Sequence, residues 1–215
     1  KIQILYNNRS KVGYKQHIFI PLYPKNLMKL DDAIEQRRSI RAFSNKKARW
    51  DYVLEAIDAA LKAPLAGNIN TLKFIIVTDE EAKKKLADYT QQDWVVNASI
   101  VIIVCSDIKS LKIMYEEHAE NYAKAQIGAA IENFLLKITD LKLGSCWIGA
   151  FLEEPIKREF KIPKHITVEA ILPVGSPSPI KKVNPIKKDS LERVIFWEKY
   201  DIIKKPTGIR DPSTM

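Results

Sequence analysis

The hydrophobic positions of the chain repeat with two different spacings, and these predict helices and strands in alternation. The longest helical pattern covers residues 119–141, where apolar side chains recur at the spacing of an α-helix for about six turns. A second helix is predicted over residues 50–63, because Pro64 cannot continue it, and a third after Asp79, which is placed to cap its first turn. A short helix is predicted around Pro155.

Apolar runs without polar interruption predict strands that are buried on both faces. Three such runs cover residues 74–77, 100–104 and 168–174, and a fourth strand is predicted over 144–151, where it enters a turn at Gly149. Strands that alternate with helices favour an α/β or α+β protein. We predict the α+β class, with a mixed central β-sheet flanked by helices.

The chain is predicted to form one core with an arm at each end. Residues 1–29 are predicted to form an N-terminal arm, residues 30–175 the core, and residues 176–215 a C-terminal extension. The extension contains large apolar residues such as Leu191 and Trp197, whose contact with water is unfavourable. We therefore expect it to pack on the core or on a partner subunit.

A short stretch after the first predicted helix gathers cationic and hydroxyl side chains. It holds Arg37, Arg38, Ser39 and Arg41 within five residues, and the helix before it is expected to begin with Asp31 as its N-cap. Guanidinium and hydroxyl groups together suit a phosphate or a carboxylate. The alternative is a solvated helix end, because cations are also favoured near a helix C-terminus.

Apolar residues on both sides of this stretch are expected to hold it in place. Ile40 and Phe43 are predicted to anchor the chain on either side of Arg41. The helix before the stretch is predicted to pack through an apolar face made of Leu30, Ala33 and Ile34.

Composition and charge narrow the class of protein. The chain is 46% hydrophobic, and its formal net charge of +9 invites a nucleic-acid-binding interpretation. However, lysines such as Lys83 to Lys85 are expected on polar helix faces, and no nucleic-acid motif is present. No apolar run reaches the length of a membrane span, and the N-terminus lacks the apolar segment of a secretion signal. These features predict a cytoplasmic protein.

Several common kinds of site have no support in the sequence. Cys105 and Cys146 lie in apolar runs and are expected to be buried and reduced. His17, His118 and His165 are isolated and lack the spacing of metal ligands, so no metal site is predicted. The glycine-rich dinucleotide fingerprint and the Walker phosphate loop are both absent.

Three segments, taken in order, resemble the nitroreductase family of flavin enzymes, which bind FMN at a dimer interface. They are residues 33–41, 63–68 and 143–151, and the resemblance extends over roughly residues 30–200. The resemblance implies that one cluster of side chains holds the flavin phosphate, the ribityl chain and the electron-rich edge of the ring. That cluster is Arg37, Arg38, Ser39 and Arg41.

The same resemblance implies further flavin contacts. Asn68 and Asn70 match the asparagine loop beside the ring, and Ile148 and Gly149 match a strand end whose backbone approaches it. Two lysines fall where the family places basic residues on the phosphate, and these are Lys187 and Lys188. Many members have Asn-x-Gln-Pro-Trp where this chain has residues 68–72, which leaves the acceptor pocket open.

The function that the resemblance implies is that of a homodimeric FMN oxidoreductase. Hydride from NADH or NADPH would reach a nitro compound, a quinone or a flavin by a ping-pong mechanism, with no catalytic side chain, because the cofactor supplies the chemistry. The same fold also allows reductive dehalogenation or flavin breakdown. A basic nucleic-acid-binding module is the alternative from a different class, although neither nucleic acid nor a membrane is the partner that we predict.

Overall fold

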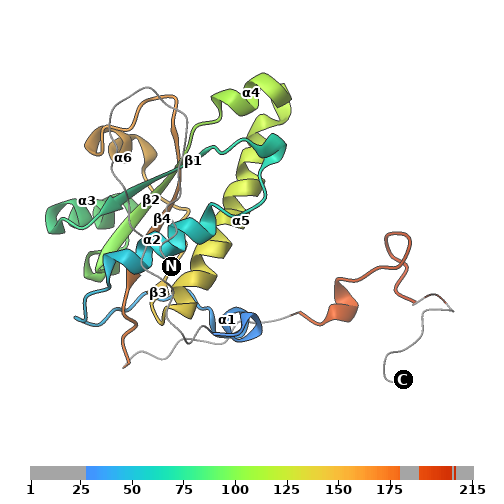
Figure 1. Cartoon of the computed structure of the whole chain (residues 1–215), viewed down its shortest axis with the longest axis horizontal. Coiled ribbons are helices and arrows are strands. Elements are labelled where there is room, and N and C mark those ends of the chain that lie inside the picture. The colour runs from blue at the N-terminus through green and yellow to red at the C-terminus, as the bar shows by residue number, and fades with distance from the viewer. Residues whose placement is uncertain (1–27, 180–188, 205, 207–215) are drawn as a thin grey trace, which may run out of the picture. The chain divides into compact units, whose positions relative to one another are not determined.

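The chain forms two compact units, residues 1–183 and 184–215. The computed structural model describes residues 28–179, 189–204 and 206. The first unit is built on a four-stranded sheet in the order β1-β2-β4-β3 (Figure 1). The strands are β1 (Leu72–Val77), β2 (Ile100–Ser106), β3 (Gly144–Ser145) and β4 (Thr167–Gly175). The predicted N-terminal arm lies almost entirely outside the described residues.

The strand pairing confirms the α+β class, but the sheet of the described residues is antiparallel where a mixed sheet was predicted. All pairs within the four-stranded sheet are antiparallel, and the parallel pairing among the described residues is an isolated bridge between Ser39 and Ser145. The strand predicted over 144–151 is shorter than expected. It ends at Ser145, and the chain rejoins β4 at Ile148, which exchanges two backbone hydrogen bonds of 3.0 Å with Ile171.

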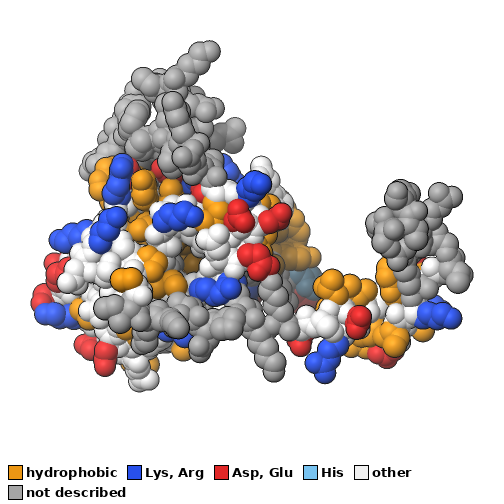
Figure 2. All heavy atoms as spheres, turned by 90° about the horizontal axis from the view of Figure 1, so that it is seen from below, with side chains coloured by type: hydrophobic (Ala, Val, Ile, Leu, Met, Phe, Trp, Pro, Cys, Tyr) orange, Lys and Arg blue, Asp and Glu red, His pale blue; other side chains and the backbone are white. Residues whose placement is uncertain are grey.

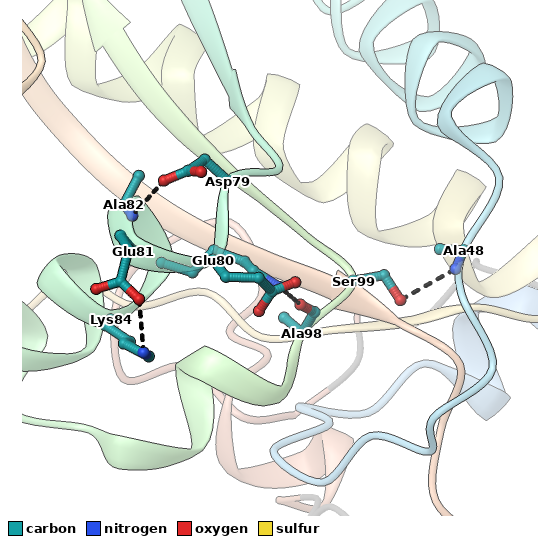
Figure 3. A network of polar contacts seen from close by, with 9 residues as sticks. Ala48, Asp79, Glu80, Glu81, Ala82, Lys84, Ala98 and Ser99 are labelled. Atoms are coloured by element: carbon teal, nitrogen blue, oxygen red, sulfur yellow. Dashed lines mark hydrogen bonds and ion pairs between the residues drawn. The ribbon is translucent and has the colours of Figure 1, made fainter.

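Most helices of the described residues lie where the hydrophobic pattern and the breakers predict them, but the helix at 109–115 was not predicted. The helices are α1 (Leu30–Gln36), α2 (Trp50–Ala60), α3 (Glu80–Thr90), α4 (Lys109–Tyr115), α5 (Ala119–Asp140) and α6 (Glu153–Glu159). The predicted cap at Asp79 is confirmed, because its side chain accepts a hydrogen bond from the Ala82 amide at 2.9 Å (Figure 3).

Helices cover both faces of the sheet, and successive residues of a strand serve opposite faces. Ile102 of β2 packs with the core formed by α2 and α5, whereas its neighbour Ile103 packs with the core formed by α3 and α6. Figure 1 shows α5 and α2 on one side and α3 and α6 on the other. This two-sided burial explains why every residue of β2 is buried.

Two expectations about the helices are wrong. Asp31 does not cap α1, because the helix begins one residue earlier, at Leu30, and Lys29 occupies the cap position. Of the predicted apolar face, Ala33 is buried, but Leu30 and Ile34 are 66% and 50% exposed among the described residues. A helix of seven residues brings only one narrow side against α5, so these two side chains remain outside it.

Lys83 also differs from the prediction of a solvated polar face. Its side chain is buried, donates a hydrogen bond of 2.7 Å to the carbonyl of Ala98, and lies 3.0 Å from the Glu80 carboxylate. Nearby, the Ser99 hydroxyl accepts a hydrogen bond from the Ala48 amide at 3.0 Å (Figure 3). The loop before β2 therefore joins α3 to the segment that leads into α2.

The second unit exposes large apolar side chains in its described part. A short 3₁₀ turn covers Leu191–Arg193. Leu191, Tyr200 and Ile203 are 71%, 80% and 72% exposed, and Figure 2 shows apolar side chains on the surface of this segment. A segment of this kind normally finds a partner surface.

None of the helices in the described part of the chain combines the length and apolar character that crossing a membrane requires.

Cys105 and Cys146 are both buried and free, as predicted. Burial raises the pKa of the Cys105 thiol to about 12, so it remains protonated and unreactive at neutral pH.

A group of buried charges lies between α2 and α5. Glu55 is 2% exposed and lies 3.7 Å from the ammonium group of Lys137, which also pairs with Asp140 at 2.9 Å. Burial raises the pKa of Glu55, Lys137 opposes this shift, and the nearby Asp51 carboxylate adds to it. The folded protein therefore holds the proton of Glu55 to a higher pH than the unfolded chain does.

The Glu55→Gln variant should be at least as stable as the wild type at neutral pH, and its free energy of unfolding should depend less on pH. Because the pKa is raised above 4.5 in the folded state, this group stabilises the fold at low pH, and that stability is lost as pH rises through the folded pKa. Urea unfolding at several pH values measures the slope of the free energy of unfolding against pH. The exposed Glu154→Gln is the control, and equal slopes for wild type and Glu55→Gln would contradict the prediction.

Candidate functional site

The arginine-containing stretch is held beside β3 by the backbone. Ser39 forms a parallel bridge with Ser145, and the Ile40 amide donates a hydrogen bond of 2.9 Å to the Ser145 carbonyl. Further along, Phe43 bridges Pro177 in the antiparallel sense. Residues 39–44 therefore run along the edge of the sheet as an irregular extra strand, which fixes the direction of the stretch.

Two glycines receive the predicted apolar anchors. Gly144 and Gly175 face each other across the β3–β4 pair. An added Cβ atom would lie 2.8 Å from side-chain atoms of Ile40 at Gly144, and 2.8 Å from the ring of Phe43 at Gly175. The prediction that Ile40 and Phe43 anchor the chain on either side of Arg41 is therefore confirmed, with glycine providing the space on the sheet.

The three arginines have different surroundings. The Nε atom of Arg37 lies 2.9 Å from a carboxylate oxygen of Glu132 on α5. Arg38 turns back on α1, where its Nη1 donates hydrogen bonds to the carbonyls of Glu35 and Arg37 at 2.6 and 2.7 Å. This arrangement satisfies carbonyl groups that a helix end leaves without partners.

Arg41 is the arginine that remains available. Its side chain is exposed and forms no hydrogen bond or ion pair with any residue that the structure describes. Close by in the fold, Ser145 is 3% exposed, and its hydroxyl has no hydrogen-bond partner among the described residues. A buried hydroxyl without a partner costs free energy, so it indicates a place where a bound group could complete the hydrogen bonding.

The strand end at Gly149 is open on its outer side. Ile148 is buried against β4, whereas Gly149 is exposed, and a Cβ atom added to it would contact nothing within 4 Å. Trp147, between these residues and β3, lies over α5, where an added Cβ at Gly128 would be 3.9 Å from its ring. The backbone at Gly149 can therefore be approached closely by a flat group.

The loop that contains Asn68 and Asn70 is attached to α5 at a different position along the helix from the arginine stretch. The Ala66 amide donates to the side-chain oxygen of Gln126 at 3.2 Å, and the Gln126 amide group donates to the Thr71 hydroxyl. Gln126 and Glu132 are separated by about 9 Å of helix rise, so the loop and the arginine stretch meet α5 almost two turns apart. Asn68 is exposed with a positive φ of 57°, and Asn70 accepts a hydrogen bond from the Leu72 amide.

Gln126 is a site-building residue whose role the sequence pattern did not reveal. It falls within the apolar stripe of α5 and is 4% exposed. The feature of the sequence that could have indicated this role is a single amide side chain within a stripe of apolar residues. Such a residue requires hydrogen-bond partners when buried, and here the partners are the ends of the asparagine loop.

The remaining predicted residues divide into two groups. Lys187 and Lys188 lie outside the described residues. His118 is exposed and 3.7 Å from Glu117, and His165 lies 4.0 Å from Asp107, both at the surface. In the described part of the chain, no group of three or more histidine, cysteine or acidic residues is placed to hold a metal ion.

Comparison of the whole chain with known proteins assigns it to one family. The model of the Nitroreductase family matches residues 34–176. A relative from Archaeoglobus fulgidus, provisionally named an NADH dehydrogenase/NAD(P)H nitroreductase, is 34% identical over 149 residues, which cover 67% of this chain and 83% of the relative. The chain therefore belongs to the Nitroreductase family of oxidoreductases.

More distant relatives and solved structures agree with this assignment. A Bacillus subtilis protein named FMN reductase is 25% identical over 163 residues, covering 68% of this chain and 65% of that protein. A nitroreductase family protein from Clostridium novyi superposes with a TM-score of 0.66 at 26% identity, covering 81% of this chain and 96% of that chain. The NADPH:FMN oxidoreductase of Vibrio harveyi, at 20% identity and a TM-score of 0.70, covers 80% and 77% and shares the fold.

The two glycines give a prediction about the anchoring of the arginine stretch. Gly144→Ala should lower the free energy of unfolding by about 1–3 kcal/mol, because the new methyl group meets the branched root of Ile40 and cannot be accommodated without a shift. Gly149→Ala is the matched control and should change the free energy of unfolding by less than about 0.5 kcal/mol. Urea denaturation compares the two variants, and equal stabilities would show that Ile40 does not depend on Gly144.

Proposed function

We propose that the protein is an FMN-dependent oxidoreductase that takes hydride from NADH or NADPH and reduces a small acceptor. The observation that carries the proposal is a pair of donors at the edge of the sheet, one exposed and one buried, that have no partner in the described part of the chain. Arg41 has no partner among the described residues, and the buried Ser145 hydroxyl beside Ser39 has none either. A ligand with a phosphate and several acceptor oxygens would satisfy such donors.

The residues that would hold FMN divide by their chemistry. Arg37, Ser39 and Arg41 would bind the phosphate, the ribityl chain and the electron-rich edge of the ring, and the open backbone at Gly149 with Ile148 would lie against the ring. Arg38 has a different role in the structure, because both recorded hydrogen bonds of its guanidinium group end on carbonyls at the C-terminal end of α1, those of Glu35 and of the capping residue Arg37. We propose that it shapes the stretch more than it binds the phosphate.

The other ligands implied by the family complete the proposed site. Asn68 and Asn70 would lie beside the ring, and Lys187 and Lys188 would add positive charge at the phosphate. The name of the Bacillus subtilis relative, FMN reductase, supports the choice of flavin. When bound, FMN supplies two-electron transfer between a nicotinamide and an acceptor.

The chain's own contribution would be position and charge. Cationic groups at the electron-rich edge favour the negative charge that reduction creates, so Arg41 would stabilise the reduced state. We propose a ping-pong order, in which the oxidised nicotinamide leaves before a nitro compound, quinone or flavin binds in its place. No side-chain acid or base is required in this scheme.

Reductive dehalogenation is the second candidate function. A Thermotoga neapolitana protein named iodotyrosine deiodinase is 22% identical over 172 residues, which cover 73% of this chain and 92% of that protein. Steady-state assays with nitro compounds, quinones, flavins and halogenated phenols would separate the two activities.

The nucleic-acid alternative gains little from the surface. On the face of the first unit seen in Figure 2, Lys and Arg side chains are spread among Asp and Glu side chains. Within the described residues many lysines also pair with carboxylates, as in Lys84–Glu81, Lys85–Glu159 and Lys112–Glu120. Paired and dispersed charges bind a phosphate backbone weakly.

We also propose that the protein functions as a homodimer. The C-terminal segment exposes Leu191, Tyr200 and Ile203, and α5 exposes Ala125 and half exposes Gly128, where a second backbone could approach. Burying such surfaces in a stable dimer typically removes more than about 2,000 Å² from water. The partner we propose is a second copy of the chain.

Arg41→Ala should weaken FMN binding at least tenfold, about 1.4 kcal/mol, because the variant lacks the free guanidinium group at the proposed site. Fluorescence titration of flavin-free protein with FMN measures the dissociation constant. The control is Arg158→Ala, which removes an exposed arginine on α6. Unchanged affinity in Arg41→Ala would overturn the assignment of this residue, and a wild-type protein that binds no flavin would overturn the proposed function.

The double variant Leu191→Glu/Ile203→Glu should shift the protein from dimer to monomer, because each change places a charge on an apolar surface that the dimer would bury. Light scattering after size exclusion should give twice the 24.6 kDa chain mass for the wild type. Lys199→Glu changes charge in the same segment and serves as the control. A monomeric wild type at micromolar concentration would refute the dimer.

A further inference from the structure

Glu132 is the one carboxylate recorded in contact with the arginine stretch among the described residues, and it comes from a different element. It stands on α5, and its carboxylate lies 2.9 Å from the Nε atom of Arg37. The two side chains are partly exposed, at 45% for Glu132 and 27% for Arg37. An ion pair this exposed contributes little to stability, so stabilising the fold does not explain its position.

The recorded contact uses one edge of the guanidinium group. It engages Nε, and neither terminal nitrogen of Arg37 makes a hydrogen bond to a residue that the structure describes. Those two nitrogens can together bind two oxygens of a phosphate. Glu132 therefore holds Arg37 and leaves its phosphate-binding edge free.

The support behind Glu132 is rigid. On either side of it, Ile131 and Leu135 of α5 are buried in the core, so the backbone at Glu132 cannot move without disturbing the packing. The other end of α1 is fixed as well, because the Met28 amide donates a hydrogen bond of 2.7 Å to Asp140. Figure 1 shows α1 beside the C-terminal part of α5.

The spacing of the two attachments matches the length of α1. Glu132 and Asp140 are about 12 Å apart along the axis of α5, and a helix of seven residues is about 10 Å long. α1 thus runs antiparallel to α5 and is attached before its first residue and directly after its last. Arg37 makes the second attachment itself, and the end of α1 sets where its side chain begins.

We propose that Glu132 is a positioning residue that orients Arg37 for the phosphate of the flavin. The inference rests on the proposed function, because it takes FMN as the ligand of Arg37. A free arginine side chain loses conformational freedom on binding, which lowers the affinity, and an arginine that is already held avoids part of this loss. Glu132 therefore raises the affinity for a phosphate without touching the phosphate.

The test compares two ligands that differ by the phosphate. Flavin-free protein is titrated with FMN and with riboflavin, and flavin fluorescence gives the dissociation constants. Glu132→Ala should weaken FMN binding about two- to tenfold and leave riboflavin binding unchanged, because riboflavin has no group for Arg37 to bind. Glu132→Gln keeps an oxygen that can accept from Nε, so it should bind FMN within about twofold of the wild type.

Controls separate positioning from general stability. Glu120→Ala removes a carboxylate at the opposite end of α5, where it pairs with Lys112 at 2.9 Å, and it should change neither affinity. Thermal unfolding of each variant shows whether the fold has been weakened.

Three results would overturn the inference. Unchanged or tighter FMN binding in Glu132→Ala would mean that Glu132 competes with the phosphate or is irrelevant to it. Equal weakening of FMN and riboflavin, with a lower melting temperature, would indicate a structural role only. Failure of Glu132→Gln to restore FMN affinity would show that the acceptor oxygen is not what matters. A wild-type protein that binds neither ligand would instead reject the proposed function, and this inference with it.

Discussion

The burial of α5 against α2 and the sheet is the constraint on which the other features depend. Its apolar residues fill one core, so its backbone is fixed along its whole length. Polar residues that lie between the apolar ones then bind other segments at fixed positions along the helix axis. Gln126 holds the asparagine loop, Glu132 contacts Arg37, and Asp140 holds the start of the α1 segment. One packed helix thereby sets the spacing of segments that are distant in the sequence.

The edge of the sheet contributes the second half of the site. Residues 39–44 can lie along β3 because Gly144 and Gly175 leave room for Ile40 and Phe43. With the apolar neighbours held on the sheet, the Arg41 side chain remains exposed. The same arrangement buries the Ser145 hydroxyl without a partner among the described residues. A small cost in stability at this edge is consistent with a place that is completed by a ligand.

The charges of the chain are arranged differently inside and outside. Glu55 and Lys83 are buried, and each has a nearby group of opposite charge or a backbone partner. The exposed lysines pair with neighbouring carboxylates at many of the described positions, which leaves the surface mixed despite the net charge of +9. In the arginine stretch, Arg37 also pairs with a carboxylate, that of Glu132, whereas Arg41 has no partner among the described residues. The overall charge does not show this difference.

Local sequence determined most helices and strands of the first unit, although not α4 or the early end of β3, and it pointed to the arginine and serine residues of the proposed site. The boundaries of α5, the cap at Asp79 and the buried strands follow from periodicity, capping and apolar runs, which act over a few residues. Tertiary structure alone decided the partners. Arg37 meets Glu132, Arg38 turns back on α1, Lys83 becomes buried, and Gln126 holds a loop. Most of these contacts join residues far apart in the chain. The choice among possible partners depends on how helices and strands pack, which a local pattern does not encode.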